Sequence, residues 1–134
     1  MALVSTFAFV AFFNAISAVL RGITVSLRFS EPWLGAVVTA VMEFSSGVAE
    51  ISEAAFPQLP AFAELFADGN IVARVITVAA LSWSGVSVHM QVAGFTASCG
   101  ISMRKYYRGK IASALLAPFI FLIFTVVGNL VTIR

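Results

Sequence analysis

Charge is what this chain has least of. Asp, Glu, Lys and Arg make up only 10% of its 134 residues, while 60% are hydrophobic, and an ordinary soluble domain is about 25% charged. A small soluble domain buries only about 60 to 70% of its unfolded surface, so in water this chain would expose large apolar patches and aggregate. The scarcity of charge therefore excludes a soluble globular domain and predicts a lipid bilayer as the surroundings of the chain.

Cysteine and histidine are equally scarce, with one residue of each. The single cysteine, Cys99, excludes an intramolecular disulfide and a multi-cysteine metal cluster, and we expect no metal or cofactor. The sequence contains no nucleophile elbow, glycine-rich phosphate loop or metal-ligand spacing, so we expect no enzymatic activity. The net charge of +2 is too small for the broad basic face that binds nucleic acid, and no nucleic-acid partner is expected.

Four long apolar runs make up most of the chain. Each has the roughly 20 residues needed to cross a hydrocarbon core ~30 Å thick, and Pro and Gly residues mark the connections between them. No Lys or Arg precedes the first run, so we expect a retained span there rather than a secretory signal peptide. The sequence predicts an all-α membrane protein, a single transmembrane domain over 1–134 with about four spans, at 2–20, 34–56, 71–99 and 111–133.

The basic residues predict an orientation, because cytoplasmic loops hold an excess of Lys and Arg. Six of the eight lie in the connections after the first and third runs. We therefore expect a multi-pass protein of the bacterial cytoplasmic membrane, with these two connections inside and both termini outside. In the outer connection, residues 61–68 fit a short interfacial helix or a plain loop equally well, since eight residues give weak evidence of periodicity. The six basic residues are Arg21, Arg28, Arg104, Lys105, Arg108 and Lys110.

The third connection interleaves cations with aromatic residues. Tyr prefers the level of the lipid headgroups, and each Lys or Arg is attracted to anionic cytoplasmic lipids by about 1 kcal/mol. We predict a lipid-interface anchor formed by Arg104, Lys105, Tyr106, Tyr107, Arg108 and Lys110.

The second run holds a carboxylate, Glu43, near its centre. A charged residue there costs roughly 2.5 to 3.5 kcal/mol, so Glu43 must be protonated, paired or turned toward a polar cavity. Glu50 lies seven residues on, nearly two turns, and shares its face. Between them, Ser45, Ser46 and Gly47 can loosen the helix, because hydroxyl groups compete for backbone carbonyls. We predict a helix that is broken or weakened near mid-membrane.

The third run has a matching polar segment, which includes the only histidine. If the second and third spans form an antiparallel hairpin with equal rise per residue, Glu43 lies level with Ser84 and the two weak points meet at mid-depth. The same alignment places Glu53 level with Arg74, and we predict a structural ion pair between them.

Two interpretations of these polar segments stay open. Unwound backbone could line a central site, as discontinuous helices do in secondary transporters, or the small polar residues could only mediate helix packing and interhelical hydrogen bonds. An ionisable group inside the membrane favours function. The predicted solute-binding residues are Glu43, Ser45, Ser46, Gly47, Ser82, Ser84, Gly85, Ser87, His89 and Gln91.

Three segments carry a family resemblance: Leu81–Val92 (LSWSGVSVHMQV), Gly100–Arg108 (GISMRKYYR) and Met42–Gly47 (MEFSSG). They resemble the sporulation integral membrane protein YlbJ family. Its members contain the nucleoside recognition or Gate domain, which is similar to part of the concentrative nucleoside transporters. Family members are about three times longer and carry two Gate-type halves, of which this chain resembles the second. The resemblance implies nucleoside handling and pairing with a second copy or a separate Gate-type half.

Two functions follow from this sequence. The first is a half-transporter-like membrane protein that binds or moves a small polar solute as an oligomer. The alternative is a non-transporting membrane assembly or interaction protein, for example in sporulation.

Overall fold

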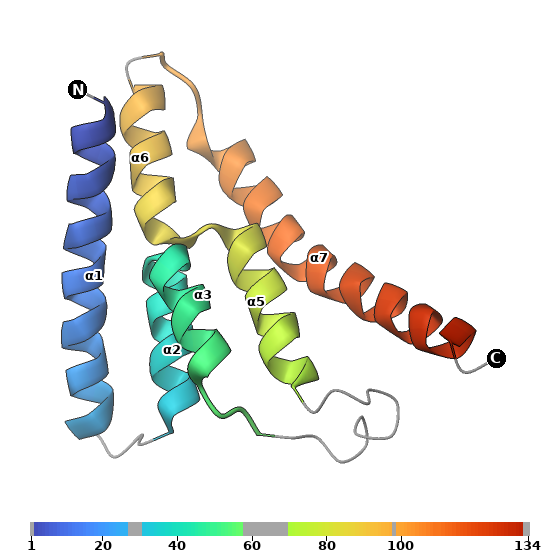
Figure 1. Cartoon of the computed structure of the whole chain (residues 1–134). Coiled ribbons are helices and arrows are strands. Elements are labelled where there is room, and N and C mark those ends of the chain that lie inside the picture. The colour runs from blue at the N-terminus through green and yellow to red at the C-terminus, as the bar shows by residue number, and fades with distance from the viewer. Residues whose placement is uncertain (1, 27–30, 58–69, 98, 133–134) are drawn as a thin grey trace.

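The computed structural model describes residues 2–26, 31–57, 70–97 and 99–132, and this part of the chain is α-helical without strands (Figure 1). Among these described residues, three segments are long and apolar enough to cross a membrane: Val4–Ile23, Ile71–Ala97 and Met103–Val131. The predicted all-α membrane protein is confirmed. The helices are α1 (Ala2–Ser26), α2 (Pro32–Met42), α3 (Phe44–Glu53), α5 (Ile71–Trp83), α6 (Gly85–Ala97) and α7 (Met103–Thr132).

The helices α2 and α3 form an antiparallel hairpin that turns at Glu43 (Figure 1). Their backbones are so close that a Cβ atom added to Gly47 would lie 2.0 Å from the Cα of Ala40. At 1.5 Å of rise per residue, helices of 11 and 10 residues reach about half of a ~30 Å core. The predicted single span at 34–56 is therefore corrected: this segment forms two short helices that fold back on each other, because a run of apolar residues has the same composition in one long helix or in two short ones.

The third predicted span is interrupted, as expected from its polar residues. Ser84 and Gly85 both adopt left-handed backbone, with φ of 74° and 73°, which is unfavourable for a residue with a side chain. The helix α5 ends before them and α6 begins at Gly85. Unlike the hairpin, α5 and α6 continue in the same general direction and together traverse the molecule (Figure 1).

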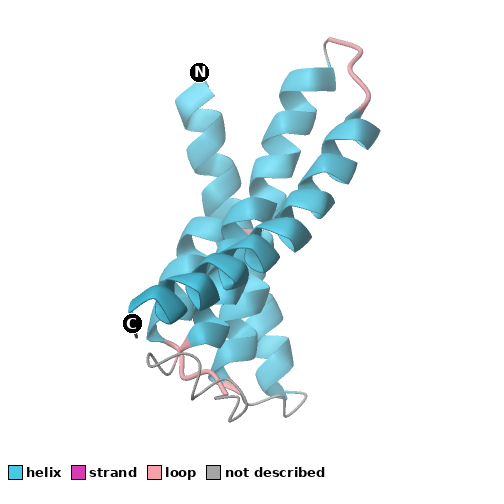
Figure 2. Cartoon of the chain, turned by 90° about the vertical axis from the view of Figure 1, so that its right-hand side faces the viewer, coloured by secondary structure: helices cyan, strands magenta, loops and turns pink. Residues whose placement is uncertain are grey.

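The arrangement of the helices determines at which end of the molecule α1 starts and α7 ends. The start of α1 and the connection between α6 and α7 lie at one end of the molecule, named here the Cys99 end (Figures 1 and 2). The bases of α2, α3 and α5 lie at the opposite end, the hairpin base, and α7 runs obliquely back toward it. The start of α1 and the end of α7 therefore lie toward opposite ends of the molecule (Figures 1 and 2), and the side of the membrane on which each terminus lies stays a prediction.

This arrangement also separates the basic residues that the sequence placed together. Arg21 lies near the hairpin base, whereas Arg104, Lys105 and Arg108 begin α7 at the Cys99 end. Arg28 and the segment 61–68, for which a helix and a loop were both open, lie outside the described residues.

Small residues allow the helices to pack closely around the hairpin, as is usual in membranes. The buried core consists of Ala36, Ala40, Ile51, Phe56, Ala73 and Ala80. By contrast, α7 packs mainly against α5 and leaves large apolar side chains exposed, among them Leu115, Phe124 and Val131. Such a surface is stable in lipid, and the buried core holds the tip of the hairpin against the interruption between α5 and α6.

Candidate functional site

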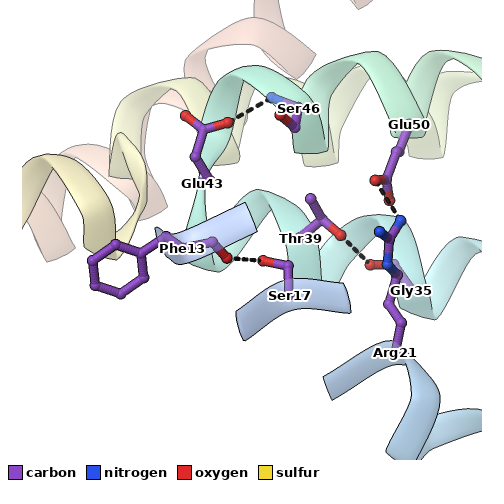
Figure 3. A network of polar contacts seen from close by, with 8 residues as sticks. All are labelled: Phe13, Ser17, Arg21, Gly35, Thr39, Glu43, Ser46 and Glu50. Carbon is purple, nitrogen blue, oxygen red and sulfur yellow. Dashed lines mark hydrogen bonds and ion pairs between the residues drawn. The ribbon is translucent and has the colours of Figure 1, made fainter. Parts of the chain in front are cut away.

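The hairpin tip is formed by Glu43, whose extended backbone (φ −139°, ψ 110°) ends α2. Its carboxylate caps α3, because it accepts hydrogen bonds from the backbone N–H groups of Ser45 (3.2 Å) and Ser46 (2.8 Å) and from the Ser45 hydroxyl (2.7 Å). Figure 3 shows the bond to Ser46. The side chain is only 1% exposed. The positive end of α3 thus compensates a carboxylate that is placed away from water.

The interruption between α5 and α6 lies against this tip. A Cβ atom on Gly85 would approach the backbone nitrogen of Phe44 to 2.9 Å and the Cα of Glu43 to 3.4 Å. In addition, the Trp83 indole N–H donates a hydrogen bond to the carbonyl oxygen of Val41 (3.3 Å). The two predicted weak points are therefore in contact in the structure.

Four helix ends converge at this place, which we name the junction: the C-terminal ends of α2 and α5 and the N-terminal ends of α3 and α6 (Figure 1). Helix ends leave backbone N–H and C=O groups without partners inside the helix. In a bilayer such groups are tolerated only where protein or water surrounds them. The junction therefore concentrates polar backbone groups in the middle of an apolar molecule.

Lys110 of α7 stabilises the interrupted helix. Its ammonium group donates hydrogen bonds to the Ser84 hydroxyl (2.6 Å) and to the Ser82 carbonyl (3.3 Å), and a cation is favourable at the C-terminal end of a helix. The sequence placed Lys110 in a connection at the lipid interface. In the structure α7 already begins at Met103, where the Ser102 hydroxyl accepts a hydrogen bond from the N–H of Arg104 (3.4 Å), so Lys110 lies two turns inside the helix.

His89 lies on the side of α6 that faces α7. Its Nδ1 atom is 2.9 Å from the Tyr106 hydroxyl, and its ring meets Trp83 edge to face at a centroid distance of 4.3 Å. The Nε2 atom is buried and has no hydrogen-bond partner among the described residues. Of the predicted interface anchor, Tyr106 and Lys110 therefore make contacts inside the protein, while Arg104, Lys105 and Arg108 are exposed.

Ser87 and Gln91 lie on a different side of α6 from His89. The Ser87 side chain is 1% exposed and its hydroxyl has no partner within the described part of the chain. Gln91, one turn further on, lines a pocket between α6 and α1. The predicted solute-binding residues are thus not gathered in one cavity: they divide between the junction and two sides of α6.

The acidic residues of α3 pair differently from the prediction. Glu50 forms an ion pair with Arg21 of α1, at 2.5 Å (Figure 3), whereas no pair between Glu53 and Arg74 is found among the described residues. The predicted pairing assumed two full-length spans in equal register. Because the hairpin packs its α2 helix against α1, the Arg21 side chain instead passes Gly35 and reaches α3.

Neither a protein family, a curated protein nor a solved structure matches this chain. Within the described residues there is also no group of three or more His, Cys, Asp and Glu side chains that could hold a metal ion.

Proposed function

We propose that this chain is a transporter-like half that binds or moves a small polar solute inside the membrane. The observation that supports this proposal is the junction, where the hairpin tip at Glu43 touches the interruption at Gly85. Discontinuous helices bring backbone dipoles to mid-membrane, and secondary transporters bind substrates and coupling ions at such places. A bundle that only anchors a protein has no need for four helix ends at that depth.

The proposal includes a second half. In transporters built from repeats, the solute site lies between two related units, and the described residues of this chain contain one hairpin and one interrupted span. We propose that a second copy, or a separate Gate-type half, completes the site. The sequence resemblance to the YlbJ family makes a nucleoside-like molecule the solute to test first.

The proposed location is the bacterial cytoplasmic membrane. Arg104, Lys105 and Arg108 are exposed at the Cys99 end and have no acidic residue beside them in sequence. Since cytoplasmic loops retain an excess of such residues, we propose that the Cys99 end faces the cytoplasm. The start of α1 lies at the same end and would face the same way.

One observation favours the alternative, a non-transporting assembly or interaction protein such as one acting in sporulation. Donors from Ser45 and Ser46 already occupy the Glu43 carboxylate, and a static hairpin would need the same helix cap. In this alternative the polar residues serve only to build the hairpin and to hold helices together.

The substitution Glu43→Gln separates the two functions. The amide keeps the size of the side chain and one acceptor oxygen, but it replaces the second oxygen by a donor group. For a half-transporter, we expect uptake of uridine by the reconstituted protein to be lost while the oligomer, measured by size-exclusion chromatography with light scattering, remains. The matched control is Glu53→Gln, an exposed residue of the same hairpin, which should leave both unchanged.

A different pair of results would contradict the transporter proposal. If the wild-type protein neither binds nor moves uridine or other neutral nucleosides, and Glu43→Gln breaks the oligomer, the transporter proposal fails and the assembly function is favoured.

A further inference from the structure

A second polar feature lies away from the junction, between the first turns of α1 and the second half of α6. It is a pocket of about 170 Å³, and both segments lie at the Cys99 end (Figure 1). The lining residues are Ser5, Thr6, Phe9, Gln91, Gly94 and Phe95.

The pocket wall is polar but uncharged. Its polar side chains are two hydroxyls and the amide of Gln91, and its apolar side chains are two phenyl rings. An amide offers two N–H donors and one carbonyl acceptor, and Gln91 makes no side-chain hydrogen bond to any residue that the structure describes. Because a half-buried amide without a protein partner is costly to leave unpaired, the pocket favours a polar occupant.

The polar face of α6 continues inward from the pocket. Ser87 precedes Gln91 by one helical turn on the same face, and its buried hydroxyl is unpartnered within the described chain. On α1, Phe13 and Ser17 follow Phe9 at the same spacing and are 7% and 0% exposed. The two helices therefore close below the pocket, and Ser87 lies between the pocket and the junction, which begins two residues earlier at Gly85.

We propose that this pocket receives the uncharged, hydrogen-bonding part of a solute, such as an amide or hydroxyl group, that approaches from the Cys99 end. This inference rests on the proposed function and adds to it a chemical class and an entry side. Charged solutes are disfavoured because no charged side chain lines the pocket and an unpaired charge at this depth is costly. The volume of about 170 Å³ is well above the roughly 10 to 15 Å³ that a single water needs, which leaves room for one polar end of a solute.

Cysteine accessibility tests the pocket without knowledge of the solute. The full chain with Cys99→Ser is reconstituted in phosphatidylcholine vesicles and carries either Gln91→Cys or Met90→Cys, the latter on the exposed apolar face of α6. The probes are three methanethiosulfonates: the neutral methyl, the anionic sulfonatoethyl and the cationic trimethylammonioethyl reagents. Because only the thiolate reacts and lipid keeps a thiol protonated, the neutral reagent should modify Gln91→Cys at least about ten times faster than Met90→Cys.

The charged reagents report the chemical class. After division by each reagent's rate with a small thiol in solution, both should modify Gln91→Cys more slowly than the neutral reagent does. Equal rates at positions 90 and 91 would overturn a hydrated pocket, and equal corrected rates for all three reagents would overturn its preference for uncharged groups. If Gln91→Cys does not fold, Ser5→Cys reports from the opposite wall.

A blocking variant links the reactivity to this pocket. A Cβ atom added to Gly94 meets no atom within 4 Å, so Gly94→Leu can fill the pocket without displacing backbone. It should slow modification of Gln91→Cys, and unchanged modification would contradict the assignment. None of these measurements depends on solute movement, so a negative uptake result for the wild-type protein would refute the proposed function and leave the pocket to be judged on its own.

Discussion

At the scale of single residues, one glycine determines whether the hairpin can close. Gly47 lies one turn after the Glu43 cap and faces the backbone of Ala40, which a Cβ atom would approach to 2.0 Å. Real Cβ atoms do not come so close to backbone, so any side chain at position 47 separates α2 from α3. The sequence predicted that Gly47 loosens a helix. In the structure Gly47 instead lies where α2 and α3 are in close contact.

We expect Gly47→Ala to destabilise the protein by about 1 to 3 kcal/mol or more, the usual cost of overpacking. The matched control is Gly22→Ala in α1, where a Cβ atom meets nothing within 4 Å and alanine should be neutral or stabilising by about 0.5 to 1 kcal/mol. Thermal unfolding of the two variants in the same detergent measures the difference. Equal melting temperatures would show that the hairpin does not pack this closely.

For Glu43, the need for a partner was predictable from the sequence, but its structural role was not. Its position near the centre of an apolar run showed that it needs a compensating group. Its role as a helix cap was not foreseen, because Ser, Thr, Asp and Asn are the preferred residues at that position. The donors are the two residues that follow it, and they become available only when the helix is interrupted.

At the scale of elements, the two interrupted segments differ in how they are held. The hairpin is closed by its own cap and by backbone contact, whereas the interruption between α5 and α6 depends on another helix, through Lys110 of α7. This contact is not predictable from the local sequence, because Lys110 stands beside Gly109 among other basic residues and was predicted to lie in a connection. The helix α7 passes through Gly109 without interruption.

We expect Lys110→Met to destabilise the protein by about 2 to 3 kcal/mol, because hydrogen bonds from a charged donor are worth roughly 1.5 to 3 kcal/mol and the Ser82 carbonyl loses its partner. Met keeps the length of the side chain. The control is Lys105→Met, an exposed position in the first turn of the same helix, which should change stability by less than about 0.5 kcal/mol. A titration with SDS that unfolds both variants at the same midpoint would contradict the role of Lys110.

At the scale of the whole molecule, the hairpin changes the topology. The start of α1 and the end of α7 lie toward opposite ends of the molecule. We therefore expect three crossings and one hairpin, which put these two ends on opposite sides of the membrane, whereas four crossings would put them on the same side. The side of the membrane that each basic residue faces then depends on the end of the folded molecule at which it lies. Arg21 and Arg74 lie at the hairpin base, and Arg104, Lys105 and Arg108 lie at the Cys99 end.

Labelling in intact cells tests this topology. Cys99 is exposed and is the native reporter for one side, and Pro57→Cys in a Cys99→Ser background reports the other, since Pro57 is exposed just beyond the hairpin. A membrane-impermeant maleimide should label position 57 in intact cells and Cys99 only after permeabilisation. Labelling of both from outside would contradict the placement of the two ends on opposite sides. Labelling of Cys99 alone would keep the topology and reverse the proposed orientation.

The lipid environment of this protein and the places where its helices are interrupted are predictable from the order of its amino acids alone. Apolar content requires lipid, and lipid requires helices because backbone groups must find partners within the chain. Glu43 and Ser82 to Gln91 marked the weak points because polar groups are costly there. Three features are visible only in the folded protein: residues 34–56 turn back, Glu50 pairs with Arg21, and Lys110 binds the C-terminal end of α5. These features depend on close approach between segments distant along the chain, and the local pattern of apolar and polar residues is the same whether or not that approach occurs.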